Sequence, residues 1–258
     1  SKYMKKAKMF FSKMHPNVPI VITNFQTAEM IKYANNSFLA TKISFINQLS
    51  NICQNIPGTN IDDVAKIIGL DPRIGKLFLN AGPGYGGSCL PKDISALINF
   101  ADKIGVNPLL LNAVKKTNHE QVNNIVSLMK KILGNIAAKR ITVLGTAFKP
   151  NTDDIRDSKS IELIKKLLKN KAKITIHDPK AIENTKKIFG EKILYAKSIS
   201  DALNKSQCVI IMTHWKQYDT LNNNSIKHMN RKIIIDCRRV LVKKKLDAKY
   251  YAIGMGKN

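Results

Sequence analysis

Residues 82–93 have the sequence GPGYGGSCLPKD, a glycine-rich loop followed by a single cysteine and then by a proline. Glycines let a backbone come close to a ligand, and Pro91 suits the first turn of a helix. We therefore expect Cys89 at a helix N-terminus, where unpaired N–H groups favour thiolate over thiol, with Lys92 near enough to help. The stretch predicts an activated nucleophile, although most single cysteines are buried small hydrophobes and most glycine-rich loops only turn the chain.

The composition is that of a globular chain with one large or two modest domains. It has 258 residues, of which 44% are hydrophobic, and this is enough for a substantial core. No apolar run approaches the ~20 residues that cross a bilayer, and the lysine-rich start lacks the apolar core of a signal peptide. We therefore expect a cytoplasmic protein that makes no membrane contact.

The formal net charge of +25 makes nucleic acid an alternative partner. The lysines are spread along the chain, however, and the sequence has neither an arginine-rich tract nor an aromatic-interleaved platform. We expect a solvated lysine-rich surface and no nucleic-acid binding. The excess positive charge would still steer anionic nucleotides toward the protein.

The four cysteines form no CxxC pair and no metal-ligand spacing. Cys53, Cys208 and Cys237 lie in apolar helix or strand patterns, which favours core packing for these three side chains. We expect no metal site, and we expect reactive surroundings only at Cys89.

Residues 1–23 look like the tail of another domain. Residues 5–13 could form a short helix, and residues 19–23, PIVIT, predict a short β-like run with no partner strand before it.

Residues 24–138 predict an all-helical central unit. Apolar residues recur there at three- and four-residue steps, and helices are expected over 27–53, 61–68 and 92–134, the last broken near Gly105–Pro108. Asn118 and His119 are expected at a helix junction, where a lone histidine is more often structural than catalytic. The apolar faces of this unit offer a dimerisation surface.

Residues 139–258 alternate strand patterns with amphipathic helices. Strands are expected over 140–145, 173–177, 208–213 and 232–236, and helices over 158–170, 180–189 and 198–204. This alternation predicts an α/β domain with a Rossmann-like, doubly wound parallel sheet, whose ligands bind at the C-terminal ends of the strands. Three loops fall at those ends, residues 145–150, 178–179 and 237–239. The domain is therefore a nucleotide binder by position.

Residues 82–93 also resemble the active-site segment of the UDP-glucose/GDP-mannose dehydrogenase family. Residues 145–158, GTAFKPNTDDIRDS, are similar to that family's UDP-binding loop, and Lys32-x-x-x-Asn36 is similar to a pair that holds the oxyanion. One departure is Asn47-Gln48, where the family usually has Asn-Glu. The resemblance implies a C-terminal portion of such an enzyme, in which residues 1–23 end an NAD-binding domain. No GxGxxG follows a strand here.

The resemblance implies an NAD-dependent, four-electron oxidation of UDP-glucose to UDP-glucuronate. Cys89 would attack a sugar aldehyde and form a thiohemiacetal and then a thioester. Lys32 and Asn36 would stabilise the oxyanion, and Asp93 would orient or deprotonate water. The implied binding residues are Arg73, Asn80, Gly82, Gly84, Tyr85, Gly86, Phe148, Lys149 and Arg238 for the UDP-sugar, and Lys92 and Arg156 for NAD.

The resemblance also implies a homodimer in which Arg73 crosses to the neighbouring subunit's substrate. Without the resemblance, Arg73, Lys149, Arg156 and Arg238 would be surface charges. Other interpretations stay open: a GDP-mannose or UDP-N-acetylhexosamine 6-dehydrogenase, a non-catalytic nucleotide-sugar-binding or dimerisation module, and a basic nucleic-acid-associated protein. Because the family's cofactor half lies upstream, we expect these residues alone to form no NADH.

Overall fold

The structure is a computed structural model that describes residues 2–256, and the chain divides into two compact units, Ser1–Asn35 and Asn36–Asn258. In the first unit, helix α1 spans Lys2–Met14, and an irregular segment follows it. The strand expected at residues 19–23 is wrong, because the described part of this unit contains no strand. A strand needs a neighbour for its backbone N–H and C=O groups, and this segment has none.

Four helices of different length then precede the sheet. They are α2 at Phe25–Cys53, α3 at Ile61–Ile68, α4 at Leu90–Lys103 and α5 at Leu109–Leu133. The expected break near Gly105–Pro108 separates α4 from α5. The junction expected at Asn118 and His119 is wrong, because both residues lie inside α5. No glycine or proline occurs between Leu109 and Leu133, so nothing in the sequence stops the helix there.

The second half forms a six-stranded parallel sheet within the described residues, in the order β3-β2-β1-β4-β5-β6. The strands are β1 at Arg140–Leu144, β2 at Lys173–His177, β3 at Leu194–Tyr195, β4 at Cys208–Ile211, β5 at Ile233–Asp236 and β6 at Lys249–Ala252. The strand order reverses at β1 and β4, so the doubly wound prediction is confirmed. The edge strands β3 and β6 were not predicted because both are short and partly exposed.

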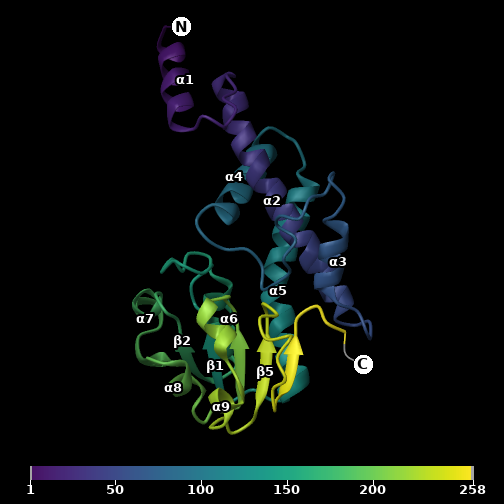
Figure 1. Ribbon diagram of the computed structural model, residues 1–258, viewed down its shortest axis with the longest axis vertical. Helices are drawn as coiled ribbons and strands as arrows, with labels where there is room; N and C mark the ends of the chain where they lie inside the picture. The colour runs from purple at the N-terminus through teal and green to yellow at the C-terminus, as the bar shows by residue number, and fades with distance from the viewer. Residues whose placement is uncertain (1, 257–258) are drawn as a thin grey trace. The chain divides into compact units, whose positions relative to one another are not determined.

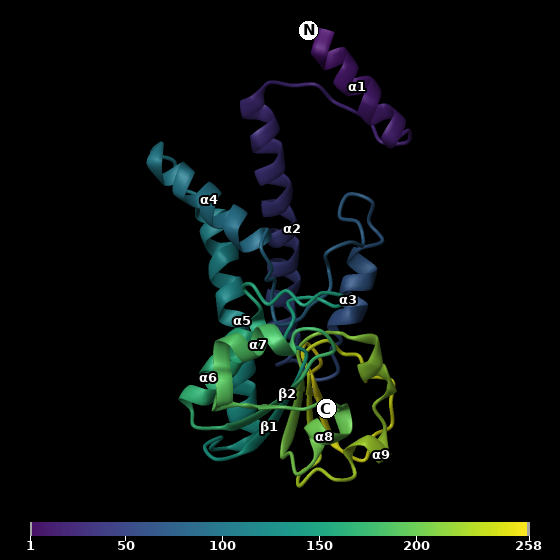
Figure 2. The ribbon, with the colours of Figure 1, turned by 90° about the vertical axis from the view of Figure 1, so that its left-hand side faces the viewer.

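Helices cover both faces of this sheet. They are α6 at Lys159–Lys169, α7 at Ile182–Phe189, α8 at Ile199–Leu203 and α9 at Asn223–Ile226. Figure 2 shows α5 and α6 on one side of the strands and α8 and α9 on the other. Each face of the sheet has its own hydrophobic core, and β4 contributes to both. Ile210 packs with α5 and α6, whereas Val209 and Ile211 pack on the opposite face.

Three of the four cysteines are buried, as expected. Cys53 packs among the helices, and Cys208 and Cys237 pack in the core between the sheet and α5. Burial raises the pKa of the Cys208 thiol to about 12, which keeps it protonated and unreactive.

Helix α5 belongs to the helical layer and to the sheet (Figure 1). Near its start, Val114 packs with Ala40, Tyr85 and Ile94 in a helical core. Its second half is buried against the strands through Val122, Ile125, Val126, Met129 and Leu133. One rigid element therefore fixes the helical layer to the sheet.

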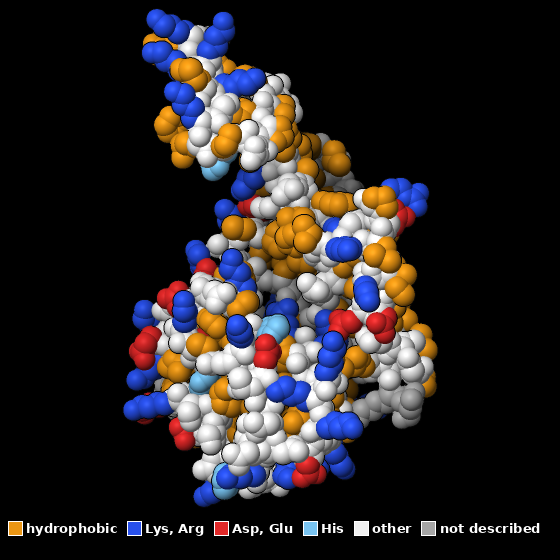
Figure 3. Space-filling view, in the orientation of Figure 1, with side chains coloured by type: hydrophobic (Ala, Val, Ile, Leu, Met, Phe, Trp, Pro, Cys, Tyr) orange, Lys and Arg blue, Asp and Glu red, His pale blue; other side chains and the backbone are white. Residues whose placement is uncertain are grey.

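The surface is basic, and its charges are dispersed. On the face shown in Figure 3, the Lys and Arg side chains lie apart over many elements rather than in one stripe. Within residues 2–256, no helix combines the length and the apolar character that a bilayer crossing requires.

The shared role of α5 predicts a large effect of truncating one side chain. Met129 is 0% exposed, so Met129→Ala should leave a cavity and lower the free energy of unfolding by about 3 kcal/mol in urea denaturation. Lys130→Ala, on the exposed side of the same helix, should change it by less than about 0.5 kcal/mol. Equal losses in the two variants would contradict this account of α5.

Candidate active site

Cys89 lies at the N-cap of α4 and is exposed to solvent. A proline occupies the first turn of that helix, as the sequence predicts, and the Sγ atom lies 3.7 Å from the Ser88 hydroxyl. The unpaired N–H groups of a helix N-terminus favour negative charge at this position. The expected placement of Cys89 is confirmed, and its role as nucleophile stays a prediction.

Asp93 joins this cysteine to helix α2. Its carboxylate is 1% exposed and accepts a hydrogen bond from Asn36 Nδ2 at 2.6 Å. The Lys92 ammonium lies 3.7 Å from the other carboxylate oxygen, and the Asp93 N–H donates to the Cys89 carbonyl at 2.9 Å. Burying a carboxylate without such partners would be costly. Four residues predicted for the site are therefore gathered at the start of α4.

Three other predicted residues lie in exposed positions. Lys32 belongs to the first compact unit, where its ammonium lies 4.8 Å from the centroid of the Tyr33 ring. Arg73 and Asn80 lie in the irregular segment between α3 and the glycine-rich loop. Arg73 has a side chain that is 86% exposed and forms an ion pair with Asp71.

The glycine-rich loop lies directly against loops of the sheet. A Cβ added to Gly82 would be 2.7 Å from Arg238 Nη1, and one added to Gly87 would be 2.6 Å from the Phe148 ring. A Cβ on Gly86 would collide with a backbone carbonyl of the neighbouring loop. The absence of side chains at these positions lets the loop reach two residues predicted to bind the substrate.

The loop also bonds to the segment that carries Arg156. The Gly87 N–H donates to the Arg156 carbonyl at 2.8 Å. The pKa of Arg156 is raised above its ordinary value mainly by its hydrogen bond to Asp154. The hydrogen bond from Gly87 holds the segment that carries Arg156 against the loop two residues before Cys89.

Two buried asparagines hold the other side of the loop. Asn118 on α5 pairs with both backbone groups of Tyr85: its Oδ1 accepts the N–H at 2.8 Å, and its Nδ2 donates to the C=O at 3.1 Å. Asn47 on α2 accepts the Gly82 N–H at 2.7 Å. Gly84 adopts a φ of +110°, and a Cβ there would be 2.5 Å from Asn118 Oδ1. The two amides thus set the path of the backbone before Cys89.

Sequence reasoning assigned no role in the site to these two asparagines. The available signal was a polar residue on the buried stripe of a helix, since Asn118 is flanked at four-residue steps by the buried Val114 and Val122. The Tyr85 ring packs in the same helical core, and burial raises the pKa of its phenol well above the ordinary value. The contribution of Tyr85 to the loop surface is therefore made by its backbone.

At the C-terminal ends of the strands, Asp178 organises the loop that follows β1. Its buried carboxylate accepts N–H groups at 2.7–3.2 Å from Thr146, Ala147, Lys180, Ala181 and the indole of Trp215. So many donors on one carboxylate fix the turn that presents Phe148 and Lys149. Sequence reasoning placed this residue at the strand end and gave it no role.

Arg238 lies at the same end of the sheet, as predicted. Its Nε donates to the Met212 carbonyl at 2.8 Å, and burial lowers the pKa of its guanidinium to about 10. Lys149 is exposed, and its ammonium lies 5.4 Å from the centroid of the Phe148 ring. The three predicted substrate-binding side chains therefore flank the glycine-rich loop or the turn beside it.

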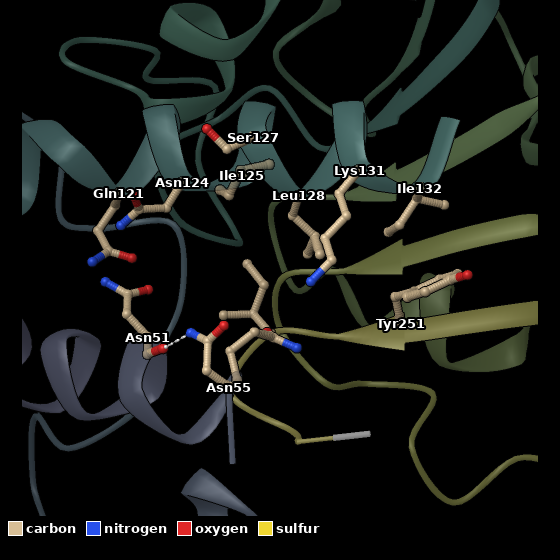
Figure 4. A pocket seen from close by; sticks show the side chains of 12 residues that line it. Asn51, Asn55, Gln121, Asn124, Ile125, Ser127, Leu128, Lys131, Ile132 and Tyr251 are labelled. Carbon is tan, nitrogen blue, oxygen red and sulfur yellow. Dashed lines mark hydrogen bonds between the residues drawn. The ribbon is translucent and has the colours of Figure 1, made fainter. Parts of the chain in front are cut away.

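A cavity of about 600 Å³ lies elsewhere, between the end of α2, α5 and β6 (Figure 4). Its lining is rich in amides, including Asn51, Asn55, Gln121 and Asn124, and Lys131 reaches into it. None of the described lining residues belongs to the predicted site. This cavity and the predicted site are thus separate features.

Comparison with known proteins agrees with this geometry. Residues 26–120 match the central domain of the UDP-glucose/GDP-mannose dehydrogenase family, and residues 142–243 match its UDP binding domain. The chain belongs to this family. The exposed cysteine and the glycine-rich loop lie in the first matched segment, and the strand-end loops lie in the second.

Relatives of known name support the same assignment. A UDP-glucose 6-dehydrogenase of Rickettsia felis is 41% identical over 253 residues, which are 96% of this chain and 56% of the relative. TuaD of Bacillus subtilis, a UDP-glucose 6-dehydrogenase, is 38% identical over 96% of this chain and 55% of its own. The structure of a UDP-glucose dehydrogenase from Pyrobaculum islandicum superposes with a TM-score of 0.87 at 33% identity, over 97% of this chain and 57% of that one. The chain thus spans a little over half the length of these relatives.

The pairing of Asn118 with Tyr85 predicts that removing the amide is costly. Asn118→Ala leaves the Tyr85 N–H and C=O buried without partners, so the free energy of unfolding should fall by about 2 kcal/mol. Asn112→Ala, at an exposed position of the same helix, should change it by less than about 0.5 kcal/mol. Chemical denaturation measures both, and indistinguishable midpoints would contradict the proposed support of the loop.

Proposed function

We propose that this chain carries the catalytic thiol and the UDP-sugar site of an NAD-dependent UDP-glucose 6-dehydrogenase, which oxidises UDP-glucose to UDP-glucuronate. One observation carries the proposal: an exposed Cys89 at the start of α4 follows a loop that contacts the nucleotide-binding end of a parallel sheet. The names of the relatives support the choice of UDP-glucose as substrate.

The sheet end would hold the nucleotide portion of the substrate. Lys149 is exposed in the turn after β1, and Arg238 is half-buried after β5, so both can make charge-assisted hydrogen bonds to a diphosphate. The backbone of the glycine-rich loop would approach the sugar, because no Cβ stands between its N–H groups and a ligand. This arrangement would set the sugar C6 beside Cys89.

The thiol would act in the second half of the reaction. Lys92 and Arg156 are exposed cations that would hold the phosphates of NAD, which would supply hydride acceptance for the two oxidations. The Cys89 thiolate would add to the C6 aldehyde, so that an S–C bond forms and the carbonyl electrons move to oxygen. Loss of hydride from this thiohemiacetal gives a thioester on Cys89.

Asn36 and Asp93 would act on the oxyanion of the thiohemiacetal and on the water that hydrolyses the thioester. The Asn36 amide would stabilise the oxyanion, an effect typically worth about 3 kcal/mol for a well-placed donor. The Asp93 carboxylate, 2.6 Å from Asn36 Nδ2, would orient a water and take its proton as the C–S bond breaks. Hydrolysis then releases the carboxylate product and restores the thiol.

A second copy of the chain would complete the site. Phe38, Phe45 and Ile52 recur every seven residues on α2 and are 65%, 51% and 52% exposed. Such an apolar stripe on one helix suits a partner helix of the same kind. Burial of this stripe in a homodimer would allow the exposed Arg73 to reach the substrate of the neighbouring subunit.

The thiol assignment is tested by Cys89→Ser. This variant should bind UDP-glucose with an unchanged Kd in calorimetry, yet form no UDP-glucuronate when assayed in a polypeptide that also carries an NAD site. In the wild-type chain, saturating UDP-glucose should slow alkylation of Cys89 by iodoacetamide about tenfold by shielding the sulfur. Full turnover by Cys89→Ser would contradict the role of Cys89 as nucleophile. Protection by GDP-mannose instead of UDP-glucose would show that the proposed substrate is wrong.

The dimer surface is tested by Phe45→Glu. A charge in the centre of an apolar interface should raise the dimer dissociation constant about thirtyfold or more in sedimentation velocity. Asn99→Glu, an equal charge change at an exposed position of α4, is the control and should leave the constant within about twofold. Dimers that persist unchanged in Phe45→Glu would place the interface elsewhere.

A further inference from the structure

Two arginines predicted to contact ligands are each paired with an aspartate in the same local geometry. Arg73 pairs with Asp71, and Arg156 pairs with Asp154, each two residues upstream. In both pairs the arginine N–H donates to the aspartate Oδ1 at 2.9 Å, and Nε donates to the same oxygen at 3.0 Å. The Nη2 group donates to Oδ2 at 2.6 Å in the first pair and 2.7 Å in the second.

The two pairs occur in unrelated surroundings. Asp71 and Arg73 lie in the turn after α3 with a proline between them, whereas Asp154 and Arg156 lie in the loop after β1 with an isoleucine between them. The two pairs nevertheless share one geometry. At a third Asp-x-Arg, Asp236–Arg238, the backbone N–H of Arg238 bonds to the aspartate in the same way, but its Nε donates to the Met212 carbonyl instead. Asp-x-Arg therefore precedes three arginines that are assigned to a ligand, and the side-chain pairing forms at two of them, Arg73 and Arg156.

In each pair the carboxylate is the more buried partner. The Asp71 and Asp154 side chains are 30% and 18% exposed, whereas those of Arg73 and Arg156 are 86% and 68% exposed. Each carboxylate takes the Nε edge of the guanidinium, so Nη1 and the second N–H of Nη2 are left for a ligand. Those donors suit the oxygens of a phosphate.

The pairs are also electrostatically matched. The hydrogen bond from Arg156 is the main cause that holds the pKa of Asp154 below its usual value, and the hydrogen bond from Arg73 does the same for Asp71. Both arginines have a raised pKa for the reciprocal reason. The carboxylates thus stay ionised and bonded at neutral pH.

We infer that Asp71 and Asp154 are positioning residues, which orient Arg73 and Arg156 toward the phosphates of a bound diphosphate. The inference rests on the proposed function and adds to it a cause for the orientation of the two arginines. A free arginine side chain would lose rotamer freedom on binding, and an arginine already held by a carboxylate loses less. The diphosphate is that of the UDP-sugar or that of the dinucleotide, and the two are separated by experiment.

The test for the second pair is Asp154→Asn. The asparagine oxygen can still accept the backbone N–H of Arg156, so the turn is kept, but its NH2 group cannot accept from Nη2. Asp153→Asn is the matched control, because this neighbouring carboxylate accepts its hydrogen bond from Asn184 rather than from Arg156. Calorimetry of each variant with UDP and, separately, with NAD+ then identifies which diphosphate is concerned.

We expect Asp154→Asn to raise the Kd of one of these ligands about three- to tenfold, and Asp153→Asn to change it less than about twofold. In an Arg156→Ala background, Asp154→Asn should add no further loss, because it acts through the arginine. Tighter binding by Asp154→Asn would mean that the carboxylate competes with the phosphate, and an additive loss would mean a purely structural role. Either result overturns the inference.

A measurement made without ligand tests the positioning role separately from the proposed function. In nitrogen-15 NMR, the Arg156 Nε–H should exchange slowly in the wild type and at least about tenfold faster in Asp154→Asn. If the wild type bound neither UDP nor NAD+, the proposed function would fail, and equal exchange rates would separately overturn the positioning role. The same series with Asp71→Asn and Arg73→Ala tests the first pair.

Discussion

The site depends on the absence of side chains at three positions of one loop. At Gly82, Gly86 and Gly87 a single added carbon would overlap Arg238, a backbone carbonyl or the Phe148 ring. Because these positions carry only hydrogen, the helical layer and the sheet meet across the loop at van der Waals distance. The start of α4, and with it Cys89, is placed by that contact.

Buried polar side chains then give the loop a single path. Asn118 and Asn47 satisfy backbone groups of the loop from the helical side, and Asp178 satisfies a set of N–H groups on the sheet side. In a low-dielectric interior, such bonds are costly to leave unmade, so the arrangement excludes alternatives as well as stabilising itself. The exposed thiol is therefore supported by groups that are not themselves exposed.

Much of the fold was predictable because it depends on local patterns. Helical periodicity located α2 to α5, buried strand runs located β1, β2, β4 and β5, and the glycine-cysteine-proline order placed Cys89 at a helix start. The features that were missed depend on contacts between distant segments. Edge strands β3 and β6 exist because a neighbour pairs with them, and residues 19–23 form no strand because none does.

The same distinction applies to the site. In the sequence, Asn118 looks like any polar residue of a helix. Its role became visible only in the folded structure, where its amide bonds to the backbone of Tyr85 in the loop. The role of Asp178 likewise follows from N–H groups that lie about thirty residues earlier in the chain. Residue type and spacing identified Cys89 as the candidate nucleophile, whereas the residues that hold its loop required the tertiary structure.

Helix α5 has a consequence for any attempt to take this protein apart. The two family matches end at residue 120 and begin again at residue 142, so a cut guided by them would fall within or just after this helix. A fragment that begins at residue 142 would lose the apolar lid of its own sheet. A fragment that stops at the end of the helix would keep α5 but expose to water the apolar side chains that the sheet normally covers. Expression of either piece by itself should therefore yield insoluble material. The chain's two compact units instead divide between Asn35 and Asn36, within α2.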